Sequence, residues 1–163
     1  MLLLGLSACA PDSTAGPSAL AAPIPDAQCP RLDGTWKSDR DLTMAYLDGY
    51  VKLGERQREG VNQLMGRLVV TFDGRTSTSV IPAWTIEVGG EKREMHAFQD
   101  VATYETLHCN DKAVVTRSRK SIYGREQVTI FNFDRPDEMW VYVGGADSEL
   151  PDSSFREYFR RQR

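Results

Sequence analysis

Two patterns of apolar residues divide the chain beyond its first thirty positions. Between residues 40 and 65, apolar side chains recur at the three- and four-residue spacing of a buried helix face. This spacing predicts two helices, at residues 40–50 and 55–65. Ser38 or Asp39 is available as the N-cap of the first helix, because a short polar side chain can accept a backbone hydrogen bond there. Gly54 separates the helices and Gly66 ends the second.

From residue 67 onward, apolar and polar residues alternate, which is typical of half-buried strands. Asp73-Gly74 is a hairpin signal, and Pro82 indicates an edge position or a bulge. The predicted strands are residues 32–38, 67–72, 80–88, 92–98, 101–109, 113–120, 126–133 and 138–143. About eight short antiparallel strands with tight connections predict a mainly β protein, a meander closed or nearly closed into a barrel.

The C-terminal segment is predicted to be a short helix. Phe155, Tyr158 and Phe159 lie at helical spacing within residues 153–161.

The first nine residues form an apolar run that ends in Leu6-Ser7-Ala8-Cys9. Such a run before small residues is typical of a secretory signal peptide. The last four residues resemble the lipobox of bacterial lipoproteins, which implies that residues 1–8 are removed and that Cys9 is acylated. The alternative is an apolar terminus with a free thiol at Cys9. No stretch approaches the roughly 20 apolar residues that a membrane-spanning helix needs.

Residues 9–30 are rich in Ala, Pro and Ser and have few bulky side chains. They cannot bury enough apolar surface to offset their ordering entropy, so we expect a flexible tether. Residues 31–163 then form one domain by length.

The net charge of −3 argues weakly against a nucleic-acid partner, which would favour a basic surface. Arginine and lysine do gather at residues 117–125 and 156–163. The simpler interpretation is a solvated strand face and a solvated end of the predicted helix.

Two of the three cysteines remain once Cys9 is assigned to lipid. In an oxidising compartment Cys29 and Cys109 are expected to pair. Neither cysteine has the spacing of a redox or zinc motif, and no metal is expected.

The order of elements resembles the calycin superfamily, which comprises the lipocalins and the fatty-acid-binding proteins. Gly34-Thr35-Trp36-Lys37 matches the first-strand motif of both groups. The helix pair after the first strand is similar to the fatty-acid-binding proteins, and a C-terminal helix is more like a lipocalin. The resemblance implies a lipocalin-like lipoprotein in which Trp36 closes the base of the barrel.

Catalytic chemistry has little support in the sequence. His96 and His108 lie in strand patterns without a clear Ser or Cys partner. Nucleophile-elbow, phosphate-loop and zinc-protease motifs are absent. Glu94 and Glu105 could face each other across a hairpin, although solvated charge is the simpler interpretation. We therefore expect no enzyme and no cofactor.

The candidate ligand residues are arginines and aromatics on the predicted strands. Arg117 and Arg119 share one strand face; inside a barrel they would bind a carboxylate or phosphate, and outside they would be solvated. The sequence leaves both orientations open. Trp84, Tyr104, Trp140 and Tyr142 either line an apolar cavity or belong to the core.

These features together predict a lipid-anchored protein of the bacterial envelope, on the periplasmic face of the outer membrane. Its expected function is to hold a small apolar or amphipathic molecule, such as a fatty acid, inside the barrel. The alternative is an interaction or structural lipoprotein with a filled barrel and no ligand.

Overall fold

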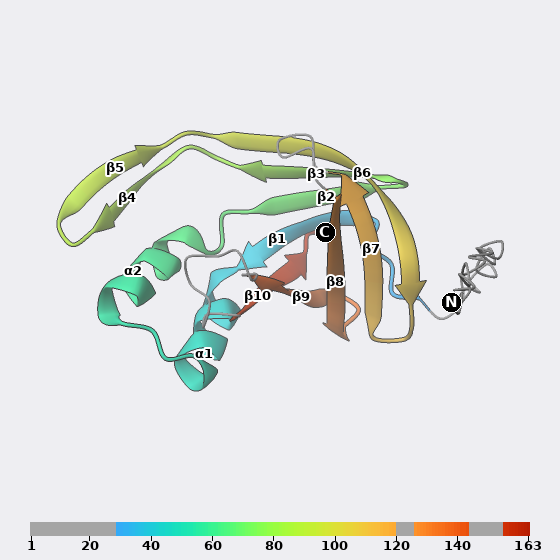
Figure 1. Ribbon diagram of the computed structural model, residues 1–163, viewed down its shortest axis with the longest axis horizontal. Coiled ribbons are helices and arrows are strands. Elements are labelled where there is room, and N and C mark those ends of the chain that lie inside the picture. Colours follow the sequence, from blue (N-terminus) through green and yellow to red (C-terminus); the bar gives the residue numbers. More distant parts are fainter. Residues whose placement is uncertain (1–28, 120–125, 144–154) are drawn as a thin grey trace, which may run out of the picture.

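The computed structural model describes residues 29–119, 126–143 and 155–163 (Figure 1). The predicted signal peptide, Cys9 and most of the tether lie outside these residues. So do Lys120 and Arg125 of the first basic cluster. The twelve elements of the described chain are β1 (Gly34–Asp39), α1 (Arg40–Tyr50), α2 (Glu55–Leu64), β2 (Val69–Asp73), β3 (Thr76–Ile81), β4 (Trp84–Val88), β5 (Glu91–Met95), β6 (Phe98–Cys109), β7 (Ala113–Arg119), β8 (Glu126–Arg135), β9 (Glu138–Val143) and β10 (Phe155–Arg161).

Eight of the strands form a closed antiparallel barrel, which confirms the predicted mainly β barrel. Their order around the barrel is β1-β10-β9-β8-β7-β6-β3-β2. Consecutive strands are neighbours for most of the circuit, and β1 closes it by pairing with both β2 and β10. The architecture is compatible with the calycin resemblance.

The helix pair follows β1, as predicted. Asp39 is the N-cap of α1, and its Oδ1 accepts a hydrogen bond of 3.0 Å from the backbone N–H of Leu42. Gly66 ends the α2 segment with φ +82°, a backbone conformation that favours glycine. Its N–H donates to the Ser38 hydroxyl over 2.9 Å, so this turn is fixed to β1.

The C-terminal segment is a strand, and the predicted helix is wrong. Phe155, Glu157 and Phe159 are buried and alternate with less buried residues, which is the two-residue period of a strand. The apolar residues at 155, 158 and 159 also fit helical spacing, so the short segment was ambiguous. Pairing decides the outcome, because β10 hydrogen-bonds to β1 on one side and β9 on the other.

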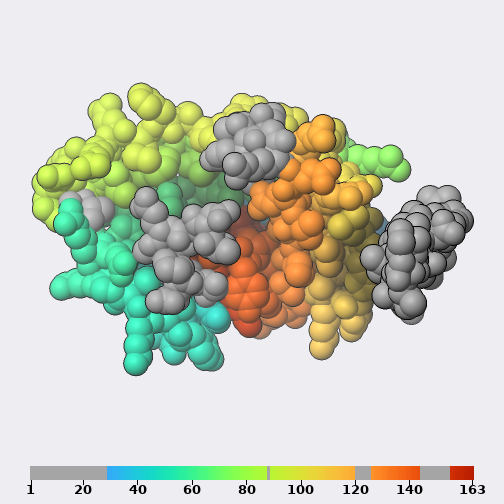
Figure 2. Space-filling model, in the orientation of Figure 1, coloured from blue at the N-terminus to red at the C-terminus, as the bar shows by residue number. Residues whose placement is uncertain are grey.

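Pro82 divides the strand predicted at residues 80–88. β3 ends at Ile81 inside the barrel wall, and β4 begins at Trp84 outside it. β4 and β5 pair only with each other in the described chain, and they form a two-stranded arm. The arm extends the β3–β6 pair away from the barrel and packs against α2 (Figures 1 and 2).

The apolar core has two parts. One cluster surrounds Trp36 and joins residues from β1, β2, β6, β7, β8, β9 and β10. The second joins Met44 and Leu47 of α1 to Met65 and to Phe155 of β10. α1 thus packs its apolar face against one end of β10, while the Trp36 cluster fills the region near the disulfide.

Candidate functional site

Trp36 is fully buried in the first cluster. Its indole N–H donates to the Leu32 carbonyl over 2.7 Å, and its ring meets that of Phe133 edge-on. The guanidinium of Arg161 lies 4.3 Å from the ring centroid. These contacts hold the segment before β1 against the barrel.

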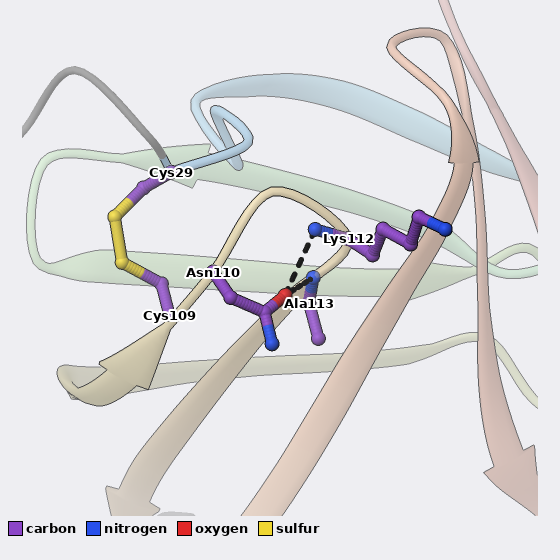
Figure 3. Close-up of a disulfide and its surroundings, with 5 residues drawn as sticks. All are labelled: Cys29, Cys109, Asn110, Lys112 and Ala113. Atoms are coloured by element: carbon purple, nitrogen blue, oxygen red, sulfur yellow. Dashed lines mark hydrogen bonds between the residues drawn. A yellow bond between two sulfur atoms is a disulfide. The ribbon is translucent and has the colours of Figure 1, made fainter.

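Cys29 and Cys109 lie beside this cluster and are joined in the structure, with their Cα atoms 5.5 Å apart (Figure 3). This is within the range of native disulfides and supports the expected pairing. Asn110 orders the adjoining β6–β7 turn, because its side-chain oxygen accepts hydrogen bonds from the N–H groups of Lys112 and Ala113 (Figure 3).

Polar side chains are also buried in the domain. Ser38 and Glu157 are both less than a tenth exposed, and the Ser38 hydroxyl donates to Glu157 Oε1 over 2.6 Å. Burial raises the pKa of Glu157, and the hydrogen bond from Ser38 only partly offsets this effect. Asp100 and Thr116 are buried as well.

The predicted ligand residues do not come together. Tyr104 packs edge-on against Phe72 of the core. Burial raises the pKa of Tyr104, and the carboxylates of Asp33 and Asp73 add to the effect. Trp84 lies on the arm, under the guanidinium of Arg67 at 5.2 Å. Trp140 follows the core residue Met139 and therefore points to the outer side of β9, where neighbouring side chains leave it only 9% exposed.

Arg117 and Arg119 also face outward, which resolves the orientation that the sequence left open. They alternate with buried Val114 and Thr116 on β7. Arg117 forms an exposed ion pair with Glu105 of β6. The hydrogen bond that Arg117 donates to Glu105 raises the pKa of Arg117. Neither arginine lies in the barrel interior, where a head group was expected to bind.

The other titratable candidates are separated. Glu94 lies opposite Thr85 on the arm, whereas Glu105 lies opposite Arg117 in the barrel wall. His96 and His108 are both exposed. Among the described residues, no group of three or more His, Cys, Asp or Glu side chains is arranged to hold a metal ion.

A cavity of about 1050 Å³ opens at the disulfide end of the molecule. It is lined by residues 29–31, the β6–β7 turn, the end of β8 with the β8–β9 turn, and Arg161 of β10. Arg31, Lys112, Arg135 and Arg161 contribute positive charge, and three aspartates contribute negative charge. Phe133 forms part of its apolar wall.

A second feature is an outward-facing cluster of aromatic residues around Arg156, named here the Arg156 surface. It consists of Tyr46, Tyr50, Trp140, Tyr142, Arg156 and Tyr158. The β9–β10 register places Trp140 opposite Tyr158 and Tyr142 opposite Arg156, so these four share one face. Tyr46 and Tyr50 come from α1, which packs on β10.

The Arg156 guanidinium lies among three of these rings. Its Cζ is 3.9 Å from the centroid of Trp140, 4.9 Å from that of Tyr46 and 5.9 Å from that of Tyr142. Burial opposes the charge, but hydrogen bonds to Tyr158 and Tyr142 outweigh it and raise the pKa of Arg156. Arg156 therefore stays charged and holds the rings in place.

Two rings of this surface are open to solvent. Tyr50 is 79% exposed and stacks on Tyr46 with centroids 5.0 Å apart. Tyr142 is 55% exposed and meets Trp140 edge-on at 5.1 Å. Sequence reasoning placed Trp140 and Tyr142 together but assigned them to a cavity or the core. It missed Tyr46, Tyr50 and Arg156, because three separate segments supply the surface.

Comparisons with known proteins add no family to these observations: no family model, no curated protein and no solved structure matches the chain. In the part of the chain that the structure describes, no helix has the length and apolar character to cross a membrane.

Proposed function

We propose that this chain is a non-catalytic, calycin-like lipoprotein of the bacterial envelope that binds a protein partner on the Arg156 surface. The lipobox-like Leu6–Cys9 sequence and the following tether support anchoring through acylated Cys9. The tether would let the barrel reach a partner at a distance from the membrane.

Two properties of the Arg156 surface support the proposal most: its residue types, and the contacts that hold these side chains in place. Trp, Tyr and Arg are the residue types enriched where protein interfaces gain most of their affinity. Here they are held by mutual contacts on paired strands and a packed helix. Preordered rings lose little conformational freedom on binding, which favours affinity.

Photo-crosslinking in a Gram-negative host tests this proposal. A benzophenone amino acid at Tyr142 or Tyr50 is expected to give one discrete protein adduct in the envelope. The same group at Leu107, an exposed residue of β6, is the control and is expected to give none. Equal adducts at all three positions, or none at Tyr142 and Tyr50, would overturn the assignment of the binding surface.

Anchoring has a separate test. The protein is expected to partition with membranes and to take up labelled palmitate, and Cys9→Ser is expected to abolish both. Two or more acyl chains are needed for stable attachment, since a single chain binds a bilayer only marginally. Label on the Cys9→Ser protein would refute acylation at this residue.

A second function, binding of a small amphipathic molecule, is favoured by the cavity at the disulfide end. Its volume of about 1050 Å³ is near the upper end of typical ligand pockets. Phe133 offers an apolar wall, and Arg135 offers charge for a carboxylate head group. Native mass spectrometry of protein from membranes is expected to show a bound fatty acid that Arg135→Ala weakens. A ligand-free protein that no fatty acid titrates would exclude this function.

A further inference from the structure

The barrel wall is incompletely paired between β8 and β9. Three pairs join these strands: Asn132 with Trp140, Phe133 with Met139, and Arg135 with Glu138. Continuing this register would place Phe131 opposite Val141 and Ile130 opposite Tyr142, but neither pair forms. In Figure 1 β8 stands beside β7 and diverges from β9. Within the described chain, residues 126–131 therefore have a partner strand on the β7 side alone.

Within the described chain, the register shows which backbone groups of this edge point away from β7. The N–H of Phe133 donates to the carbonyl of Lys112 in the β7 direction, over 2.7 Å. Backbone groups alternate in direction along a strand, so those of residues 127, 129 and 131 also face β7. The N–H and C=O groups of Glu126, Val128 and Ile130 then face the open side. The Asn132 side chain reaches only the Ile130 carbonyl, over 3.4 Å.

The side chains beside this edge are apolar and exposed. Val128 is 58% exposed and Ile130 is 49% exposed. Sheet edges that stay monomeric are usually protected by lysine, proline or a bulge. Glu126 is the one charged residue among residues 126–131. The edge is thus suited to pair with another strand. The best partner strand would place β-branched side chains beside Val128 and Ile130.

We propose that the β8 edge is a self-association surface, on which β8 of a second copy of this chain pairs antiparallel about a two-fold axis at Val128. β8 of a second copy meets this requirement, because it presents the same outward β-branched residues and has the same open edge. A centre at Val128 uses residues 126–130 and leaves Asn132 paired with β9. It places Val128 beside its own copy and Glu126 opposite Ile130, so no like charges face each other.

This inference does not depend on the Arg156 surface or on any ligand. The test uses the full chain carrying Cys9→Ser, so that no acyl group drives association. Sedimentation velocity is expected to show a concentration-dependent dimer. Val128→Lys is expected to weaken the dimer at least tenfold, because it places two like charges together at the centre of the interface.

Val80→Lys is the matched control. Val80 is an exposed valine of the barrel wall, but it is paired on both sides, with Val69 and Gln99. Its substitution is expected to leave the dimer intact. Circular dichroism melts of both variants check that the barrel remains folded.

A cross-link fixes the register. Opposite residues of an antiparallel pair have Cα atoms about 4.5 to 5.5 Å apart, which suits a disulfide. Val128→Cys is therefore expected to give a disulfide-linked dimer on mild oxidation, and Val80→Cys to stay monomeric on non-reducing gels. A monomeric wild-type chain, a dimer unaffected by Val128→Lys, or a dimer in which Val128→Cys does not cross-link would each overturn the proposal.

Discussion

At the residue scale, the buried carboxyl group of Glu157 is the feature with the clearest consequence for stability. Among the described residues it accepts one hydrogen bond, from Ser38, which only partly compensates the burial of its charge. Burial raises its pKa above the ordinary value of 4.5. A carboxyl group with a raised pKa in the folded state favours folding when protonated, and it opposes folding once it ionises.

The pH dependence follows from this sign. The native state holds the proton to higher pH than the unfolded state does, so the free energy of unfolding falls as pH rises from about 4.5 through the raised pKa. Glu157→Gln keeps an acceptor for Ser38 without the charge. We expect it to remove this fall and to stabilise the protein at pH 7 by on the order of 1 kcal/mol.

Urea unfolding at a series of pH values from acid to neutral measures this effect. Glu105→Gln is the control, because Glu105 is exposed on β6 and pairs with Arg117 in solvent. A difference between wild type and Glu157→Gln that stays constant across the series would contradict the account.

At the scale of elements, Asp39 connects α1 to the barrel. Its Oδ1 caps the helix by accepting from Leu42, and its Oδ2 accepts from Arg160 of β10 over 3.1 Å. Arg160 also pairs with the buried carboxylate of Glu138 on β9. One side chain thus serves both the start of α1 and the closure of the sheet.

Asp39→Ala is expected to lower the free energy of unfolding by about 1 to 2 kcal/mol from the lost cap alone. Asp39→Asn keeps a capping oxygen and loses the charge, so it should recover most of that amount. Asp41→Ala, at an 89% exposed side chain in the same turn, is expected to change stability by less than about 0.5 kcal/mol. Equal losses for Asp39→Ala and Asp41→Ala in chemical denaturation would exclude the capping role.

The sequence alone predicted those elements in which the spacing of apolar residues fits either a helix or a strand, but not both. α1 begins and ends at the predicted residues, and the alternating segments became strands. β10 was mispredicted because the four-residue spacing of Phe155 and Phe159 fits both a helix and a strand, and only its distant partners Gly34–Asp39 and Glu138–Val143 select the strand. The Arg156 surface was missed for the same physical reason, since its residues meet only after the barrel has closed.

At the scale of the whole molecule, the Cys29–Cys109 bond connects the start of the domain to the end of β6, across 80 residues. Closing so long a loop in the unfolded chain stabilises the folded state by roughly 4 kcal/mol in the chain-entropy model. We expect Cys29→Ser with Cys109→Ser to lower the melting temperature by a corresponding amount, in thermal melts of protein exported to the periplasm of an expression host. Peptide mass spectrometry without reduction should find the two cysteines joined; free thiols at both would refute the pairing.

The Arg156 surface is proposed as the site where a partner protein binds. The most direct measurement is the affinity of the purified, crosslinked partner for wild type, Tyr142→Ala, Tyr50→Ala and Leu107→Ala, by titration calorimetry. Truncation of a central aromatic residue is expected to cost about 2 kcal/mol, which is roughly a thirtyfold loss of affinity. We predict such losses for Tyr142→Ala and Tyr50→Ala and none for Leu107→Ala. Wild-type affinity in both tyrosine variants, with each still folded, would contradict the account.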